Sequence, residues 1–195
     1  MKSFSLSLIA FFCVCASLFA QDEILYKNAS VLFENSLSTL SNAEKIEIFK
    51  LTGFELAANE SQFYLSDDPD TADDPFDVKV LPLDLNDDGT EEIAIEYGNN
   101  TSSGIAGKST LLIVKDMEGN YGVNFGFPGT LVFLNINPFT LPDILVRNRQ
   151  PGFPIWRWNG MTYNIHEQFD NKKLSKMRIT YLTDANKSYT VKVKK

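Results

Sequence analysis

Apolar residues recur at three- and four-residue steps over residues 22–52, the spacing of one buried face of an α-helix. Ser41-Asn42-Ala43-Glu44 has the capping-box pattern that begins a helix, and Gly53 is a typical residue at a helix end. We therefore predict two short helices, packed as a hairpin, in an N-terminal segment spanning residues 21–60.

From residue 61 the hydrophobic period changes to two and turn residues become frequent, which predicts antiparallel strands through 61–195. The expected strands are 77–83, 92–97, 109–115, 120–126, 130–135, 143–148, 154–158 and 161–166, followed by 177–182 and 188–194. The first eight fall into two sets of four, each ending in a tight hairpin. Asn159-Gly160 in the second hairpin is typical of a two-residue type I′ turn. Residues 66–77 hold six aspartates and two prolines, which predicts an exposed, mobile acidic loop.

The two sets of strands align with an offset of 51 residues. Asp84-Leu85-Asn86 matches Asn135-Ile136-Asn137, and the strand beginning at Glu92 matches the strand beginning at Asp143. This predicts a repeated four-stranded unit over 76–126 and 130–169, with the last strands, together with 61–65, as candidates to begin a third. A closed propeller needs at least four blades, so these units cannot close one. We expect a mainly β (α+β) fold of antiparallel units resembling partial propeller blades or a sandwich-like stack, with the helical hairpin covering an open edge.

The first twenty residues have the layout of a secretory signal peptide. Met1-Lys2 is positively charged, an apolar stretch runs over 6–19, and Ala20 precedes the predicted cleavage site. No later apolar run approaches the roughly 18 residues of a membrane helix, so we expect a periplasmic or secreted protein that does not span a membrane.

Composition and charge exclude several classes of function. The net charge of −7 makes nucleic acid a poor partner. His166 is the single histidine, and both cysteines lie within residues 1–20, which excludes a zinc cluster or a cysteine nucleophile in the mature chain. Any metal must therefore be held by oxygen atoms.

The segment from Asp84 to Glu92 places oxygen-bearing side chains at positions 1, 3, 5 and 9 of a nine-residue loop, with Gly89 at position 6. Calcium takes six to eight oxygen ligands, and a loop that curls round it presents alternate side chains inward. An EF-hand would need a carboxylate at position 12, where Ile95 stands, and the flanking residues alternate like strands. We predict a calcium-binding loop between two strands; the alternative is an acidic turn without an ion.

This pattern, D-x-N-x-D-G-x-x-E followed by an apolar strand, resembles the calcium loop of FG-GAP repeats, the integrin-propeller type also found as VCBS-like repeats in secreted bacterial proteins. The resemblance implies one structural calcium ion rather than a catalytic one. It implies as metal ligands Asp84, Asn86, Asp88, Thr90 (through its carbonyl) and Glu92, with Asp87 and Glu91 outside the coordination sphere. The second copy departs from the pattern at Phe139, Thr140 and Pro142, so a single metal site is implied.

Trp156 and Trp158 lie on the same face of a predicted strand because they are two residues apart. Exposed, they could stack on a sugar or anchor a protein partner; buried, they belong to the core of the second unit, which is the favoured arrangement.

Charge is distributed unevenly along the chain. Residues 21–171 carry 24 acidic and 9 basic side chains, a net −15, whereas 172–195 carry 8 basic and 1 acidic, a net +7. We expect the basic end to lie beside the acidic face; the alternative is a patch for an anionic partner.

Together these features predict an exported, calcium-binding, non-catalytic binding protein of the bacterial envelope, with a protein or cell-wall glycan as partner. One specific form is an inhibitor of a peptidoglycan hydrolase, since exported proteins with a similar calcium loop include such inhibitors and basic lysozymes would suit an acidic surface. The alternatives are a hydrolase that acts on a glycan, with Trp156 and Trp158 as a sugar platform, and a structural envelope protein.

Overall fold

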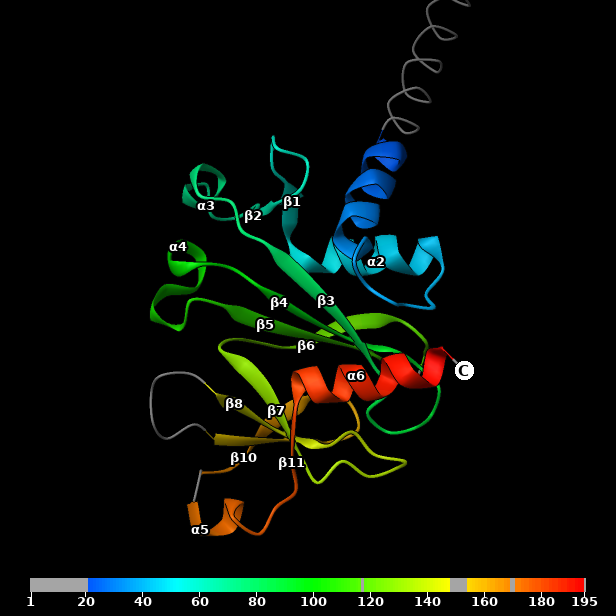
Figure 1. The fold of residues 1–195 in the computed structure, drawn as a ribbon, viewed down its shortest axis with the longest axis vertical. Coiled ribbons are helices and arrows are strands. Elements are labelled where there is room, and N and C mark those ends of the chain that lie inside the picture. Colours follow the sequence, from blue (N-terminus) through cyan, green and yellow to red (C-terminus); the bar gives the residue numbers. More distant parts are fainter. Residues whose placement is uncertain (1–20, 117, 148–153, 169–170, 195) are drawn as a thin grey trace, which may run out of the picture.

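The computed structural model describes residues 21–116, 118–147, 154–168 and 171–194 (Figure 1). The predicted signal peptide, residues 1–20, lies outside them. The described chain is mainly β, with antiparallel sheets that form no closed barrel and helices at its N-terminal end, as the sequence predicts.

The N-terminal helical hairpin is confirmed. One helix covers residues 21–33, and α2 spans Asn42–Thr52. Ser41 and Glu44 form the predicted capping box, in which each side chain accepts a hydrogen bond from the other residue's backbone N–H. Gly53 ends α2 in the left-handed conformation, with φ of 68°, which glycine adopts without steric cost.

Two meanders of four consecutive strands follow, close to the predicted boundaries, and a fifth strand, β11, joins the second of them. The first sheet has the order β3-β4-β5-β6, and the second has the order β10-β9-β8-β7-β11. Their strands are β3 (Val78–Leu83), β4 (Glu92–Tyr97), β5 (Ser109–Lys115), β6 (Tyr121–Pro128), β7 (Thr130–Leu134), β8 (Asp143–Arg147), β9 (Pro154–Trp158), β10 (Tyr163–Gln168) and β11 (Ile179–Tyr181). Between β4 and β5 lie the short helices α4 (Asn100–Ser103) and η1 (Gly104–Ala106), and α5 (Asn171–Leu174) precedes β11.

The elements stack in three layers: N-terminal helices, first sheet, second sheet (Figure 1). Alternate residues of the first sheet face opposite cores. On β4, Ala94 packs toward the second sheet, whereas Ile93 and Ile95 pack against the N-terminal helices.

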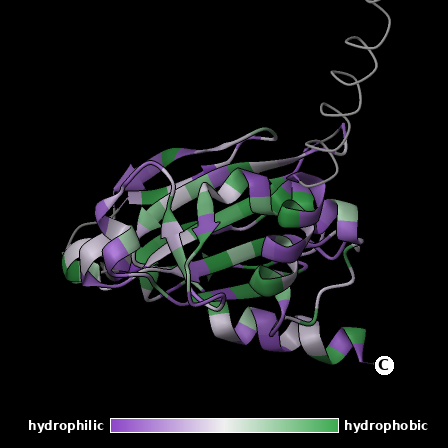
Figure 2. Ribbon diagram, turned by 90° about the horizontal axis from the view of Figure 1, so that it is seen from above, coloured by the Kyte–Doolittle hydropathy of each residue, from purple (hydrophilic) through white to green (hydrophobic). Residues whose placement is uncertain are grey.

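Because β3, β4 and β5 are covered on both faces, each contains a continuous buried hydrophobic stretch, residues 80–83, 93–95 and 112–114. Green segments accordingly gather in the middle of the molecule in Figure 2. The helical hairpin therefore covers a face of the first sheet. It covers an open edge, as predicted, only in part: α2 contacts β6, an edge strand of this sheet, and Glu47 accepts a hydrogen bond of 3.2 Å from the Tyr121 N–H.

The C-terminal strands were also predicted wrongly. Only β11 is a strand; α6 (Leu182–Val193) is a helix that lies along β3, the edge strand of the first sheet. Leu182 and Tyr189 are buried at a seven-residue spacing, and the Asn186 side chain donates a hydrogen bond to the Pro82 carbonyl at 2.8 Å. The helix thus covers part of the open β3 edge and satisfies one of its carbonyl groups. The sequence had predicted such cover from the N-terminal hairpin.

Three local predictions also need correction. The strand β2 (Phe63–Leu65) pairs with β1 (Phe54–Leu56), so it does not join the C-terminal strand in a third unit. The acidic segment contains a helical turn, α3 (Asp70–Asp73), anchored by the fully buried Thr71. Trp158 pairs with Tyr163, so the Asn159-Gly160 hairpin has a four-residue loop instead of a two-residue turn.

Candidate metal loop and adjoining groove

The loop of residues 84–92 joins β3 to β4, so it connects two strands as predicted. Its polar side chains fold back onto the loop. Glu92 accepts a hydrogen bond from the Leu85 N–H at 2.7 Å, and Asp88 accepts one from the Thr90 N–H at 2.7 Å. The Asn86 amide nitrogen donates to the other oxygen of Asp88, also at 2.7 Å.

Two oxygen atoms of this loop are buried without a hydrogen-bond donor: Asp84 Oδ1 and Asn86 Oδ1. A buried polar atom without a partner costs roughly 1–3 kcal/mol. These atoms belong to positions 1 and 3 of the predicted calcium loop. A hard cation would satisfy both, so the residues present fit the ion that the resemblance implies.

Glu92 is buried at the base of the loop. Burial, and then the negative charges of Asp88 and Asp84, raise the pKa of Glu92 to about 8, although the Leu85 N–H opposes the shift. A divalent cation among these carboxyl groups would remove the repulsion. In the described part of the chain, however, no three or more His, Cys, Asp or Glu side chains converge as a metal cluster. The candidate set depends on the Asn86 amide and the Thr90 carbonyl as well as on carboxylates.

The corresponding loop of the second unit, residues 135–143, provides an internal comparison. Its polar oxygens are satisfied by the protein itself. Asn135 Oδ1 accepts from the Arg178 N–H, Asn137 Oδ1 accepts from the Thr140 hydroxyl, and Asp143 accepts two hydrogen bonds from Arg157 at 2.9 and 2.7 Å. Protein donors therefore bond the side-chain oxygens of the second loop, whereas the first loop has two buried oxygens without a donor.

The two loops also touch each other. The Phe139 N–H donates a hydrogen bond of 2.7 Å to the Asn86 carbonyl. Phe139 stands at the position equivalent to Asp88, two residues from Asn86, so the two loops matched by the 51-residue offset meet in space.

Lys192, on α6, contacts two carboxylates of the first loop. Its ammonium group lies 3.2 Å from Asp84 Oδ2 and also contacts Asp87, and hydrogen bonds to these carboxylates raise the pKa of Lys192. This contact agrees with the expectation that the basic C-terminal segment lies beside the acidic face. The segment ends in the helix α6, where the sequence had predicted a strand over 188–194.

We expect Lys192→Met to tighten calcium binding about tenfold. The substitution removes a positive charge that would repel the ion, and an interaction of this size is reasonable for charges several ångströms apart near a surface. Titration calorimetry measures the change, with Lys187→Met, an exposed lysine of the same helix, as the control. Unchanged or weaker calcium binding in Lys192→Met would contradict the expected position of the ion.

Glu91, which the resemblance implies lies outside the coordination sphere, has a structural role that the sequence did not predict. Its buried carboxylate accepts hydrogen bonds from the Ser38 hydroxyl and from the backbone and hydroxyl of Thr39, at 2.5–2.6 Å, and from the Tyr189 hydroxyl. Burial, with this hydrogen bond, raises the pKa of Tyr189 to about 12. Glu91 thus joins the linker of the N-terminal hairpin to α6. The sequence signal for Glu91 is only its place in the chain, as an acidic residue between the candidate metal ligands Thr90 and Glu92.

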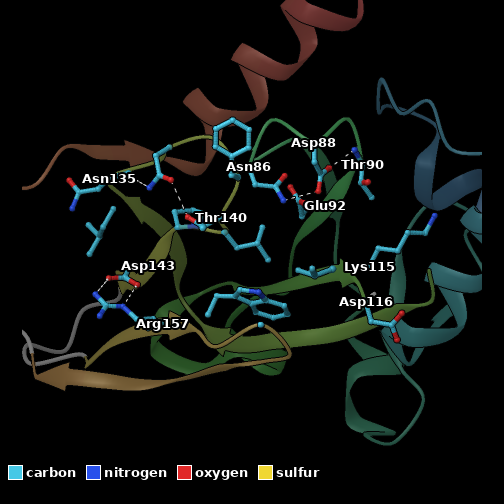
Figure 3. A pocket seen from close by; sticks show the side chains of 18 residues that line it. Asn86, Asp88, Thr90, Glu92, Lys115, Asp116, Asn135, Thr140, Asp143 and Arg157 are labelled. Atoms are coloured by element: carbon cyan, nitrogen blue, oxygen red, sulfur yellow. Dashed lines mark hydrogen bonds and ion pairs between the residues drawn. The ribbon is translucent and has the colours of Figure 1, made fainter. Parts of the chain in front are cut away.

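A groove of about 850 Å³ opens beside the loop (Figure 3). One wall is formed by the metal loop, with Asn86, Asp88, Thr90 and Glu92, and the facing wall by the second loop and β9. Trp158 lines this groove and packs on Tyr163, with ring centroids 5.3 Å apart. Trp156 is instead packed against Phe125 at 5.0 Å. Both tryptophans are half-buried against the core between the sheets.

No protein-family model matches the chain, and neither a curated protein nor a solved structure matches it. Among the residues that the structure describes, no helix has both the length and the apolar character to cross a bilayer.

Proposed function

We propose that this is an exported, calcium-binding, non-catalytic binding protein of the bacterial envelope, periplasmic or secreted. The observation that carries the metal part is the pair of buried oxygens without donors, Asp84 Oδ1 and Asn86 Oδ1. The second loop supports it by contrast, because protein donors bond the oxygens at the equivalent positions there.

The residues that would hold the ion are Asp84, Asn86, Asp88, Thr90 (through its carbonyl) and Glu92. Bound calcium supplies positive charge to a loop that is otherwise rich in carboxylates. Glu91 within the loop contacts the N-terminal linker and α6, so an ordered loop would fix three parts of the fold together. The role of the metal is therefore structural.

Export is supported by the signal-peptide pattern of residues 1–20. A binding role is supported by the groove, which has a volume typical of a ligand site. The carboxylate of Asp143 in that groove is held in an ion pair with Arg157, which suits a structural side chain better than a catalytic acid or base.

The test is a calcium titration by calorimetry on the protein without residues 1–20, comparing Asn86→Ala with Asn137→Ala. These two asparagines occupy equivalent positions in the two loops. We expect one calcium ion per wild-type chain, binding weakened at least tenfold in Asn86→Ala, and unchanged binding in Asn137→Ala. The absence of heat with wild-type protein, or an equal effect of both substitutions, would overturn the calcium proposal.

A further inference from the structure

Phe139, at the edge of the groove, has an unusual combination of properties. Its side chain is 91% exposed, and its backbone lies in the left-handed region, with φ of 79°. Bulky residues rarely adopt this conformation, which costs about 1 kcal/mol or more. The hydrogen bond from its N–H to the Asn86 carbonyl holds it there. The fold therefore positions a large aromatic ring in solvent, with no contribution to the core.

A second aromatic ring lies within the groove. Trp158 is half-buried, and its contact with Tyr163 behind it restricts its movement. The groove therefore contains one fixed ring and one exposed ring at its edge, both among its lining residues. Rings of this kind stack on the apolar faces of flat or cyclic ligands.

The polar groups between these rings suit hydroxyl groups. Asn137 and Thr140 line the groove. One hydrogen of the Asn137 amide is bonded to the Asn135 carbonyl and the amide oxygen accepts from the Thr140 hydroxyl, which leaves the second amide hydrogen and the Thr140 oxygen for a ligand. Asp116, which lies outside residues 84–92, adds a carboxylate acceptor. Ring faces combined with amides, hydroxyls and carboxylates are the groups that a saccharide needs, because a sugar has apolar C–H faces edged by hydroxyl donors.

The charges in the groove disfavour an anionic ligand. Its two basic side chains each have a carboxylate partner: Arg157 is paired with Asp143 at 2.7 Å and Lys115 with Glu44 at 2.9 Å. The remaining charged side chains among the lining residues are acidic, so the lining offers phosphate or uronate groups no basic side chain without a carboxylate partner. A neutral ligand does not need one.

We propose that this groove binds a neutral oligosaccharide of a cell-wall or surface glycan, with Phe139 and Trp158 stacking on sugar rings and Asn137 and Thr140 bonding its hydroxyls. This inference rests on the proposed function, because it names the partner class of the binding protein and one wall of the groove is the metal loop. It uses only side chains of this chain and assigns no sugar contact to the ion.

The test measures binding of the protein without residues 1–20, in calcium, to a panel of soluble neutral oligosaccharides that includes N-acetylglucosamine oligomers, with acidic oligosaccharides alongside. Phe139→Ala removes an exposed side chain and should leave folding intact. Ile105→Ala, at a position 75% exposed and outside the groove lining, is the matched control. We expect a neutral oligosaccharide to bind, with affinity about tenfold lower in Phe139→Ala and unchanged in Ile105→Ala.

Calcium binding is titrated on the same samples, and Phe139→Ala should retain it. If calcium binds and no neutral oligosaccharide does, the saccharide inference is overturned and the proposed function stands. If the wild-type protein binds a neutral oligosaccharide but binds no calcium, and Phe139→Ala weakens the sugar binding, the inference stands and the metal proposal fails. Binding of acidic oligosaccharides alone, equal affinity in wild type and Phe139→Ala, or inhibition of a basic lysozyme in place of sugar binding overturns the inference.

Discussion

Replacing Glu91 by alanine is expected to lower the free energy of unfolding by about 3–4 kcal/mol. Glu91 is 3% exposed and accepts hydrogen bonds from Ser38, Thr39 and Tyr189. Its removal leaves the Thr39 N–H and the buried Tyr189 hydroxyl without that acceptor. Because these donors belong to the N-terminal linker and to α6, the substitution loosens two elements at once.

Urea unfolding measures this change against Glu23→Ala, which alters an exposed glutamate on the first helix. Tyr189→Phe should cost about 1 kcal/mol, since it removes one hydrogen bond and leaves the other donors of Glu91 in place. If Glu91→Ala lies within about 0.5 kcal/mol of Glu23→Ala, the carboxylate does not join these elements in solution.

Calcium at a thousand times its dissociation constant is expected to raise the free energy of unfolding by about 4 kcal/mol, because the ion binds the folded loop and not the unfolded chain. For a chain of this size the corresponding rise in melting temperature is roughly 10 °C. Thermal unfolding in calcium and in chelator measures it, and the shift should be lost in Asp88→Ala.

Asp116→Ala is the control for this prediction, since Asp116 lines the same groove but lies outside residues 84–92. It should retain the full calcium-dependent shift. An identical melting temperature in calcium and in chelator for the wild-type protein would contradict a structural role for the metal.

The elements that the sequence predicted well have local signals. The capping box at Ser41 and the glycine at the end of α2 each act over a few residues, and the short apolar stretch of β4 is bounded by polar residues. The α6 helix lacks such signals. Its N-cap residue, Tyr181, makes no side-chain hydrogen bond to the first turn, and the apolar residues Tyr189, Val191 and Val193 alternate as in a strand. Both valines are exposed, and contacts with the β3 edge and the metal loop hold the helix instead.

The candidate site divides in the same way. The positions of the oxygen side chains in the loop could be predicted from spacing alone, because they follow one another along nine residues. The contacts of Glu91 with Thr39 and Tyr189 join residues 52 and 98 positions away, and Lys192 lies 108 positions from Asp84. Such pairings depend on how the helices pack on the sheets, which no local pattern contains. In the sequence, Phe139 is only a departure from the repeat, and nothing local indicates that its ring is exposed.

The most direct test of the central claim is a crystal structure of the protein grown with calcium, with the ion located by its anomalous scattering. We predict one ion in the loop, bound by Asp84 Oδ1, Asn86 Oδ1, Asp88, Glu92 and the Thr90 carbonyl at about 2.3–2.6 Å. A loop without an ion at saturating calcium, or an ion bound only elsewhere on the acidic surface, would contradict it.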